Sequence, residues 1–324
     1  MTEIVARTGL VVTEAEAARV MRYFRAHVSA NTARCYAHDF KHWQIWCDGR
    51  RIQPTPVDPL QLAIYITALA EDGKSVGTIA RVLSALNKVE EVAGRAKLRT
   101  YREVRLTFAG ICRTHGVAPI QADPLTPNQL RSMIAAMPDG DAWEIRYARN
   151  RAILTIGFAG ALRCSEITGL NWGDVQKTDD GLRVKLRRSK TDQLGKGALI
   201  GLPWGAYASS CPVRSLAAWS QIADTDSAMP IFVGTTPRGS RLTHRRLTPR
   251  QIQNIIKRAA ALAGIDRRIT SHSLRAGFAT TAARHGKPLQ AIMRQTRHKR
   301  ADRVLQYIRE ENLFADNAAD GIGL

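Results

Sequence analysis

Seven polar side chains in the second half of the chain have types and spacings that suit a common chemical task. They occur in the stretches GALRCSEITGL, RRSKTDQ, SHSLRAG, QTRHKRAD and VLQYIRE, where hydrophobic periodicity does not explain them. The candidate site residues are Arg163, Glu166, Lys190, His272, Arg275, His298 and Tyr307.

The two arginines suit a phosphate. A guanidinium keeps its charge and offers several N–H donors to one phosphate, so Arg163 and Arg275 would stabilise the added negative charge of a pentacoordinate phosphorus. His272 lies one helical turn before Arg275, so both side chains can face the same phosphate.

The other candidates supply proton transfer and attack. His272 and His298 can donate hydrogen bonds or move protons near neutral pH. Lys190, at the end of a predicted strand, can protonate a leaving oxygen. Tyr307 can form a covalent phosphoester once a positive site lowers its effective pKa. Together the residues predict phosphoryl transfer to tyrosine without a metal or cofactor.

Each candidate taken singly has a simpler explanation. Arg163 would form a salt bridge with Glu166, which lies three residues later. His272 would be a polar group at a helix N-terminus, and Tyr307, between apolar neighbours, would be a core tyrosine. Only the joint occurrence of the set favours a site.

Composition points to a polyanionic partner. The chain has 324 residues, a net charge of +20 and 44% hydrophobic residues. Such a surface attracts nucleic acid or anionic membrane, and the lack of a lipidation motif favours nucleic acid. We find no apolar run long enough to span a membrane and no signal peptide, so we expect a cytoplasmic, nucleoid-associated protein of prokaryotic, phage or plasmid origin.

Neither disulfides nor zinc is expected. The five cysteines are widely spaced and form no C-x-x-C pair. The stretch HDFKH at 38–42 is superficially similar to a zinc helix, but Asp39 replaces the glutamate and no third ligand is evident.

The elements that must position the candidates form two predicted domains. Residues 1–117 read as short helices with glycine stops, and the proline-containing segment 118–125 is the linker. Residues 126–324 read as mostly helical, and GLRVKLRRSK and GALIGLP are the only convincing strands. The predicted fold class is mainly α with a small β-sheet.

The ordered set of candidates resembles the tyrosine recombinases, the phage integrase family, and in particular its simple Cre-like members. The likeness covers roughly residues 15 to 315. It implies an N-terminal helical (SAM-like) core-binding domain and an α/β catalytic domain that form a C-shaped clamp on DNA.

The resemblance implies a role for each candidate. Tyr307 would attack the scissile phosphate, giving a 3′-phosphotyrosine and a free 5′-hydroxyl, and Lys190 or nearby Lys196 would protonate the leaving oxygen. Arg163 and Arg275 would hold the non-bridging oxygens. The remaining roles are acid/base catalysis by His272, hydrogen-bond donation to the phosphate by His298, and orientation of a catalytic neighbour such as His272 by Glu166.

The resemblance also implies an assembly. Four protomers would act on two inverted-repeat DNA sites through a Holliday junction, without ATP, metal or accessory proteins. The tail after the tyrosine would pack into a neighbouring protomer through Leu313 and Phe314; the alternative is a frayed terminus.

DNA contacts are expected in both domains. The segment Gly239–Arg258 has no acidic residue and six arginines or lysines. The family places this region in the major groove, where Arg250 would read a base or contact a phosphate. The expected backbone contacts are Arg241, Arg245 and Arg246.

In the first domain the resemblance places two helices against DNA. Thr32, Arg34 and Cys35 fall on one of them, and Arg81 falls on the other. A solvated helix face is the alternative for Arg34 and Arg81.

Three rival functions share these features. A type IB topoisomerase would relax supercoils as a monomer by the same chemistry. A telomere resolvase usually carries further domains. A DNA-binding protein with a decayed site is disfavoured because every catalytic position is filled.

Overall fold

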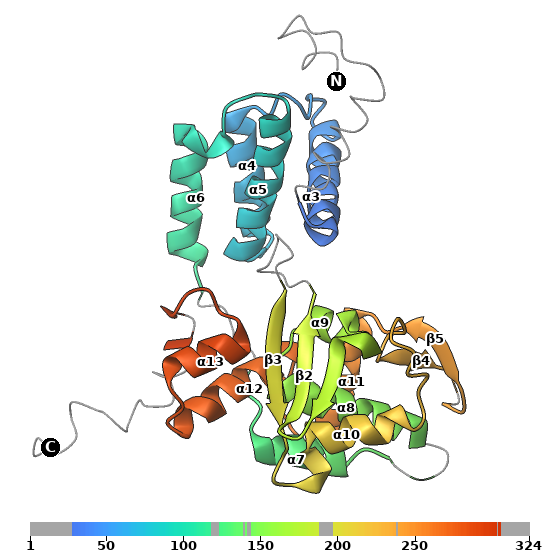
Figure 1. The fold of residues 1–324 in the computed structure, drawn as a ribbon. Coiled ribbons are helices and arrows are strands. Elements are labelled where there is room, and N and C mark those ends of the chain that lie inside the picture. The colour runs from blue at the N-terminus through green and yellow to red at the C-terminus, as the bar shows by residue number, and fades with distance from the viewer. Residues whose placement is uncertain are drawn as a thin grey trace, which may run out of the picture. The chain divides into compact units, whose positions relative to one another are not determined.

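The computed structural model describes residues 28–117, 123–138, 140, 144–187, 197–237, 239–302 and 304–305. The chain divides into two compact units, Met1–Pro119 and Ile120–Leu324 (Figure 1). Each unit has its own hydrophobic core, so each can hold a functional surface by itself.

The described part of the first unit is helical. Its elements are α3 (Ala30–Asp48), α4 (Pro59–Glu71), α5 (Val76–Val92), the 3-10 turn η1 (Leu98–Thr100) and α6 (Arg102–His115). Polar side chains cap the first two of these helices: the Ser29 hydroxyl accepts from the backbone N–H of Thr32, and the Asp58 carboxylate accepts from the backbone N–H of Gln61.

The core of the first unit is built from the apolar stripes of these helices. Helix α3 packs on α5, and α4 packs on α6. Trp43 is buried, its indole N–H donates to the carbonyl of Pro54 at 2.8 Å, and its ring stacks on Trp46. The periodic aromatic residues of α3 therefore serve packing.

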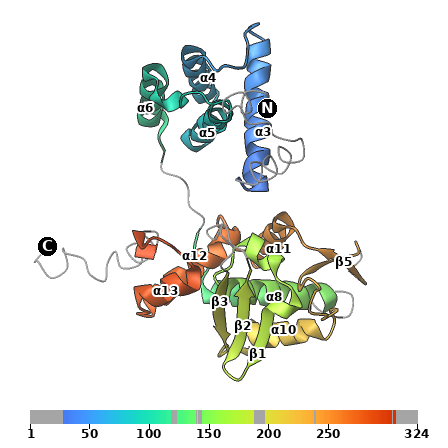
Figure 2. The same ribbon diagram turned by 45° about the horizontal axis from the view of Figure 1, so that its top comes forward.

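The second unit combines helices with two small sheets (Figure 2). Its helices are α7 (Pro127–Ala135), α8 (Glu144–Ala159), α9 (Cys164–Gly169), α10 (Pro212–Ser220), α11 (Pro249–Leu262), α12 (Ser271–Arg284) and α13 (Leu289–Thr296). Its strands are β1 (Val175–Thr178), β2 (Gly181–Leu186), β3 (Ala198–Pro203), β4 (Val233–Thr235) and β5 (Leu242–Arg246). The short 3-10 turns are η2 (Trp172–Asp174) and η3 (Ala208–Ser210). The predicted fold class, mainly α with a small sheet, is confirmed.

The larger sheet has the antiparallel order β1-β2-β3. Leu182, Val184 and Leu186 alternate inward on β2 and join the core that α8 and α10 also form. The prediction of only two strands was wrong. The four-residue β1 is too short to show a period, and β5 is so basic that it reads as a nucleic-acid contact rather than as a strand.

Helix α12 makes a close backbone contact that sets the depth of its first turns. The backbone N–H of Leu125 donates to the carbonyl of Ser273 at 3.1 Å. A Cβ at Gly277 would lie 1.9 Å from the carbonyl oxygen of Leu125, so only glycine fits there. This approach holds the turn of α12 that carries Arg275.

Among the described residues, no helix is both long and apolar enough to cross a membrane.

Candidate active site

Arg163 is placed by a tight turn. Helix α8 ends at Ala159, Ala161 has a left-handed φ of 45°, and Arg163 is the N-cap residue of α9. Its backbone N–H donates to Glu166 Oε2 at 2.9 Å, and its Nη1 donates to Glu166 Oε1 at 2.7 Å. The salt bridge that was the simpler explanation of this pair exists, and it also fixes the direction of the Arg163 guanidinium.

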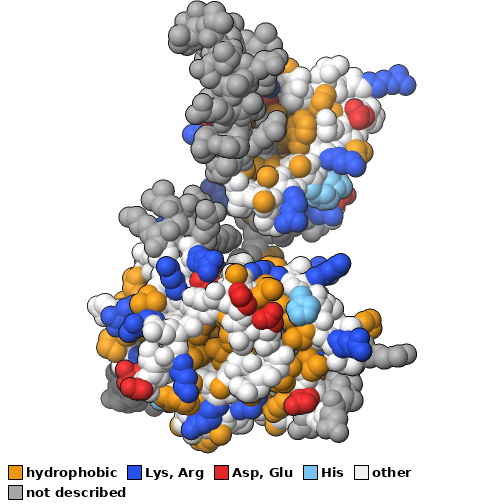
Figure 3. All heavy atoms as spheres, turned by 45° about the vertical axis from the view of Figure 1, so that its right-hand side comes forward, with side chains coloured by type: hydrophobic (Ala, Val, Ile, Leu, Met, Phe, Trp, Pro, Cys, Tyr) orange, Lys and Arg blue, Asp and Glu red, His pale blue; other side chains and the backbone are white. Residues whose placement is uncertain are grey.

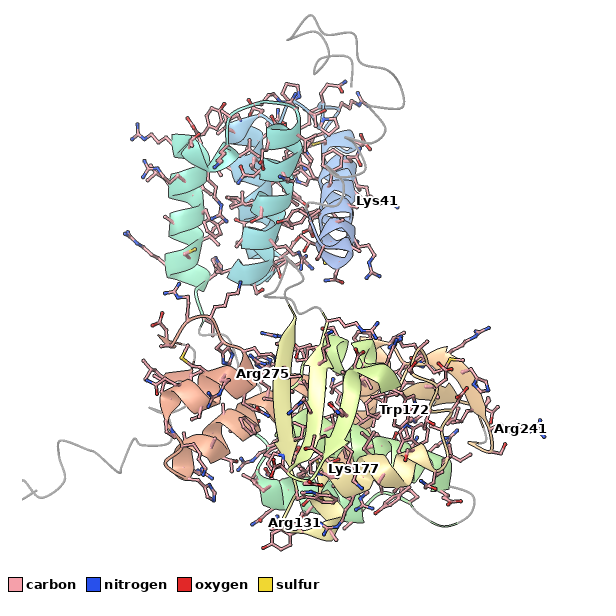
Figure 4. The ribbon with its side chains drawn as sticks, viewed as in Figure 1. Lys41, Arg131, Trp172, Lys177, Arg241 and Arg275 are labelled. Carbon is pink, nitrogen blue, oxygen red and sulfur yellow. The ribbon has the colours of Figure 1, made fainter. Side chains whose placement is uncertain are left out.

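Arg275 is almost fully buried, with 1% of the residue exposed, and it enters the site from α12 (Figure 4). Its Nη1 donates to the carbonyl of Ala161 at 2.9 Å. The turn that presents Arg163 is therefore the same turn that receives Arg275.

His272 stands at the exposed beginning of α12. The Thr270 hydroxyl accepts from the backbone N–H of His272 at 3.1 Å, and the Ser273 hydroxyl accepts from the backbone N–H of Thr270 at 3.0 Å. This cap leaves the imidazole in the first turn, one turn before Arg275.

Arg297 belongs to the same cluster, although sequence reasoning did not select it. It ends α13 with a left-handed φ of 57°. Its Nη2 donates to Glu166 Oε2 at 2.8 Å and to the carbonyl of Ala161 at 2.9 Å. Its Nη1 donates to the carbonyl of Gly160 at 3.0 Å. In the sequence it stands in a run of charged residues, RHKRAD, and no periodicity there distinguishes a buried arginine from an exposed one.

His298 lies where these charges meet. Burial, followed by the charges of Arg275, Arg163, His272 and Arg297, lowers the pKa of its imidazole to about 4. Its Nδ1 lies 2.9 Å from the Thr296 hydroxyl. The imidazole is therefore neutral at pH 7, and its electrostatic partners show that three segments of the chain converge on one place: the first turns of α12, the start of α9 and the end of α13.

Glu166 is the negative centre of this basic cluster. Burial acts to raise its pKa, but the charges of Arg297 and Arg163 and the hydrogen bonds from Arg163 more than offset burial and lower it. The carboxylate is thus ionised. The resemblance implies that Glu166 orients a catalytic neighbour such as His272, and the side chains that its carboxylate binds in the structure are those of Arg163 and Arg297.

Four predicted residues lie outside the described residues: Lys190, Tyr307, Leu313 and Phe314. The chain is described up to Leu305, and Val304 is fully buried against Ala279 of α12 and Ile292 of α13. Val304 therefore packs on α12, which carries Arg275, and on α13, which precedes His298.

Two of the predicted DNA contacts in the first unit already have partners within the chain. Both Nε and Nη2 of Arg81 donate to the buried carboxylate of Asp39 at 2.8 Å. The Thr32 hydroxyl lies 2.8 Å from that of Ser29. Arg34 is exposed and Cys35 is half-buried on α3. Asp39, which stands where a zinc helix has glutamate, is thus the partner of an arginine.

The predicted DNA contacts in the second unit gather on β5 and α11. Arg250 is exposed in the first turn of α11, and Arg241 projects outward beside the β4–β5 hairpin (Figure 4). Arg246 donates to the carbonyls of Thr168 and Leu170 at 2.5 and 3.1 Å, so it also fixes the end of α9.

A cleft of about 670 Å³ opens between α8, the β4–β5 hairpin and α11. Its described lining residues include no carboxylate, and they include the arginines Arg146, Arg149, Arg245, Arg246 and Arg258. Basic side chains are also spread over the face of the molecule drawn in Figure 3. This surface favours an anion.

Comparison with known proteins agrees with this arrangement. The profile of the phage integrase family matches residues 123–312, and the profile of the phage integrase N-terminal SAM-like domain matches residues 23–97. The chain belongs to the phage integrase family, and it is a tyrosine recombinase, an enzyme of site-specific recombination. The resemblance inferred from the ordered residues is confirmed.

Its relatives carry recombinase names. The chain is 34% identical over 292 residues to an integrase/recombinase XerD homolog of Selenomonas ruminantium, covering 89% of this chain and 84% of the relative. It is 25% identical over 268 residues to the tyrosine recombinase XerD of Proteus mirabilis, covering 82% of this chain and 78% of the relative.

Solved structures share the fold. A XerH site-specific recombinase bound to its palindromic difH substrate superposes with a TM-score of 0.58 at 16% identity, over 82% of this chain and 72% of the other. A lambda integrase (75–356) dimer bound to a core site superposes with a TM-score of 0.56 at 14% identity, over 92% and 95%. These likenesses confirm the predicted helical and catalytic folds.

Proposed function

We propose that this recombinase cuts and rejoins DNA at a specific site through a 3′-phosphotyrosine formed at Tyr307. The observation that carries the proposal is the convergence of Arg163, Arg275 and His272 on His298, where burial and then the charges of these groups lower the pKa of the imidazole. Positive groups from separate segments, brought together around one point, are what a pentacoordinate phosphate needs.

Arg163 and Arg275 hold the two non-bridging oxygens of the scissile phosphate. The Ala161 carbonyl and the Glu166 carboxylate fix one N–H face of each guanidinium, so both enter the reaction already oriented. Preorganised donors stabilise developing charge without reorganising at the moment of reaction.

His272 and His298 have different roles in the reaction. His272, at the exposed end of α12, acts as the acid/base group. His298 donates to the phosphate, and the anion, by placing negative charge beside it, raises the pKa of His298 again. Lys190 protonates the 5′-oxygen that leaves as Tyr307 attacks. Phosphorus exchanges one P–O bond for another, so ATP and metal are unnecessary.

DNA is the partner of both domains, 1–117 and 126–324, which close on the duplex as a C-shaped clamp with the linker 118–125 crossing it. Arg250 reads a base, and Arg241, Arg245 and Arg246 contact the DNA backbone. The contacts of the first domain come from its two groove-facing helices, which carry Thr32, Arg34, Cys35 and Arg81. Support comes from the exposure of Arg250 and Arg34, from the arginine-lined cleft, and from related structures whose titles describe bound DNA.

Four protomers exchange strands on two inverted-repeat sites through a Holliday junction, with Leu313 and Phe314 of each tail packed into a neighbour. The reaction takes place in the cytoplasm, at the nucleoid, without accessory proteins.

The test is capture of the covalent intermediate. Purified protein is incubated with a library of nicked duplexes that carry random inverted repeats, and DNA that stays attached under denaturing conditions is sequenced. Adducts with the wild type and none with Tyr307→Phe support the proposal. Adducts with both proteins would show that another residue attacks. Relaxation of any supercoiled plasmid by a monomer would favour a topoisomerase instead.

A further inference from the structure

Arg297 joins the segments that carry Arg163, Glu166 and His298. Besides its bonds to Glu166 Oε2 and to the carbonyls of Gly160 and Ala161, its Nη1 donates to the carbonyl of Gln295 at 2.5 Å. Only 8% of its side chain is exposed. These contacts of Nη1 and Nη2 reach the turn after α8, the carboxylate on α9 and the end of α13, so the guanidinium is a bridge between segments.

We propose that Arg297 is a positioning residue of the active site, which holds Glu166, and through Glu166 the phosphate-binding guanidinium of Arg163, in register with the turn that carries His298. The inference rests on the proposed function, because it assigns a support to the residues that would bind the phosphate.

The carboxylate geometry explains the need for this support. Glu166 Oε1 receives Arg163 Nη1, and Oε2 receives both the backbone N–H of Arg163 and Arg297 Nη2. With Arg297 present both oxygens are held by guanidinium groups, so the carboxylate has one orientation. Without it, Glu166 would still bind Arg163, but the pair would be free to move relative to His298.

Arg297 itself does not act on the phosphate. Its Nη1 and Nη2 are both committed to acceptors within the protein, and the side chain of Arg163 is more exposed, at 19% compared with 8%. The two arginines therefore have different roles: Arg163 contacts the substrate, and Arg297 supports Arg163 from the protein interior through Glu166.

The backbone at this position points to a role for the side chain. A φ of 57° is favourable for glycine and unfavourable for arginine. The contacts of the guanidinium must therefore compensate for a backbone conformation that a residue with a Cβ adopts reluctantly.

The left-handed backbone at position 297 also allows a variant that removes the side chain without disturbing the turn. Arg297→Gly removes the guanidinium while it keeps, and even relaxes, the turn. We expect single-turnover formation of the Tyr307 adduct to slow about 10- to 100-fold at saturating DNA, with DNA affinity within about twofold of wild type. Added guanidinium ion should restore part of the rate, and Arg297→Lys should lie between the two proteins.

A second readout does not depend on DNA. The groups that face His298 are Arg275 and His272 from α12, Arg163 from the start of α9, and Arg297 beside it. Removal of the Arg297 charge should therefore shift the NMR titration of His298 upward, and the pH profile of adduct formation should move with it.

Arg300→Gly is the matched control, because Arg300 is three residues away and 82% exposed in a surface pair with Asp302. Its adduct rate and the His298 titration should stay at the wild-type values. An Arg297→Gly protein with the wild-type rate and an unchanged His298 titration would overturn the proposal. So would a slow protein with a lowered thermal midpoint, no response to guanidinium and an unchanged pH profile, which would show a purely structural role.

Failure of the proposed function is a different result. In that case the wild type itself forms no adduct, and the His298 titration still decides the placement of Arg297: an upward shift in Arg297→Gly supports it, and no shift contradicts it.

Discussion

Arg275 and Arg297 donate to one acceptor, the carbonyl oxygen of Ala161, at 2.9 Å each. They stand 114 and 136 residues after Ala161 in the chain. The left-handed turn at Ala161 thus joins α12 and the end of α13 to the start of α9, and the site depends on this meeting point.

Substitution of Glu166 by glutamine should destabilise the second unit. It leaves two largely buried arginines without their counter-charge, which costs about 3 kcal/mol by analogy with other broken buried pairs. Chemical denaturation of wild type and Glu166→Gln measures the difference. Equal free energies of unfolding would show that the carboxylate charge is unimportant.

Glu166 should also make the stability of the fold depend on pH in the acid range. Because its neighbours lower the pKa of Glu166 from the usual 4.5, its ion pairs stabilise the folded state fully above that pH. This stabilisation is lost as the pH falls through the folded-state pKa. Below pH 4.5 the thermal midpoint of wild type should fall more steeply than that of Glu166→Gln, and parallel curves would contradict the assignment.

His298 predicts a second, separate pH window. Its pKa is about 4 in the folded protein and 6.5 in an unfolded chain, so between these values the unfolded state binds a proton that the folded state does not. Stability should therefore decrease as the pH falls from 6.5 to 4, by up to about 3 kcal/mol. The slope of the unfolding free energy against pH in this range should flatten in His298→Asn. It should persist in His42→Asn, which changes an exposed histidine. An equal slope in His298→Asn would assign the effect to other groups.

The Arg81–Asp39 pair predicts that one expected DNA contact also stabilises the fold. Asp39 is 3% exposed, so Arg81→Ala leaves a buried carboxylate without its partner and should cost about 2 kcal/mol. Arg34→Ala changes an exposed side chain and should weaken DNA binding at an unchanged thermal midpoint. A double-mutant cycle with Asp39→Asn isolates the pair, and a coupling energy near zero would contradict it.

Substitutions of Arg250 and Arg245 should affect DNA binding in two different ways. Loss of a base-reading arginine costs about 1–3 kcal/mol at one base pair and relaxes specificity there, which Arg250→Ala should show. Loss of a phosphate contact weakens binding to all sequences and reduces the slope of log K against log salt by about one, which Arg245→Ala should show. Binding isotherms at several salt concentrations on matched and mismatched sites distinguish the two, and identical profiles would refute the division.

The helices could be predicted from short stretches of sequence. The side chains of Ser29, Asp58 and Thr126 cap α3, α4 and α7, and such a cap depends only on residues within one turn. Strands β1, β4 and β5 escaped prediction, since a short strand depends on partners that the local sequence does not contain. Arg149 shows the same limit: it stands in the polar first half of α8, between Arg146 and Arg151, and its burial and lowered pKa, about 10, come from the fold around it.

The sequence by itself determined the family, the fold class and the identity of the chemical groups, because these depend on residue type and on spacing along the chain. Only the tertiary structure decided that Glu166 binds Arg297 as well as Arg163, that Arg81 is tied to Asp39, and that His298 is neutral. Pairing, burial and electrostatic field arise when segments far apart in the chain pack together, 42 residues apart for Arg81 and Asp39 and 131 for Arg297 and Glu166, and no local pattern carries that information.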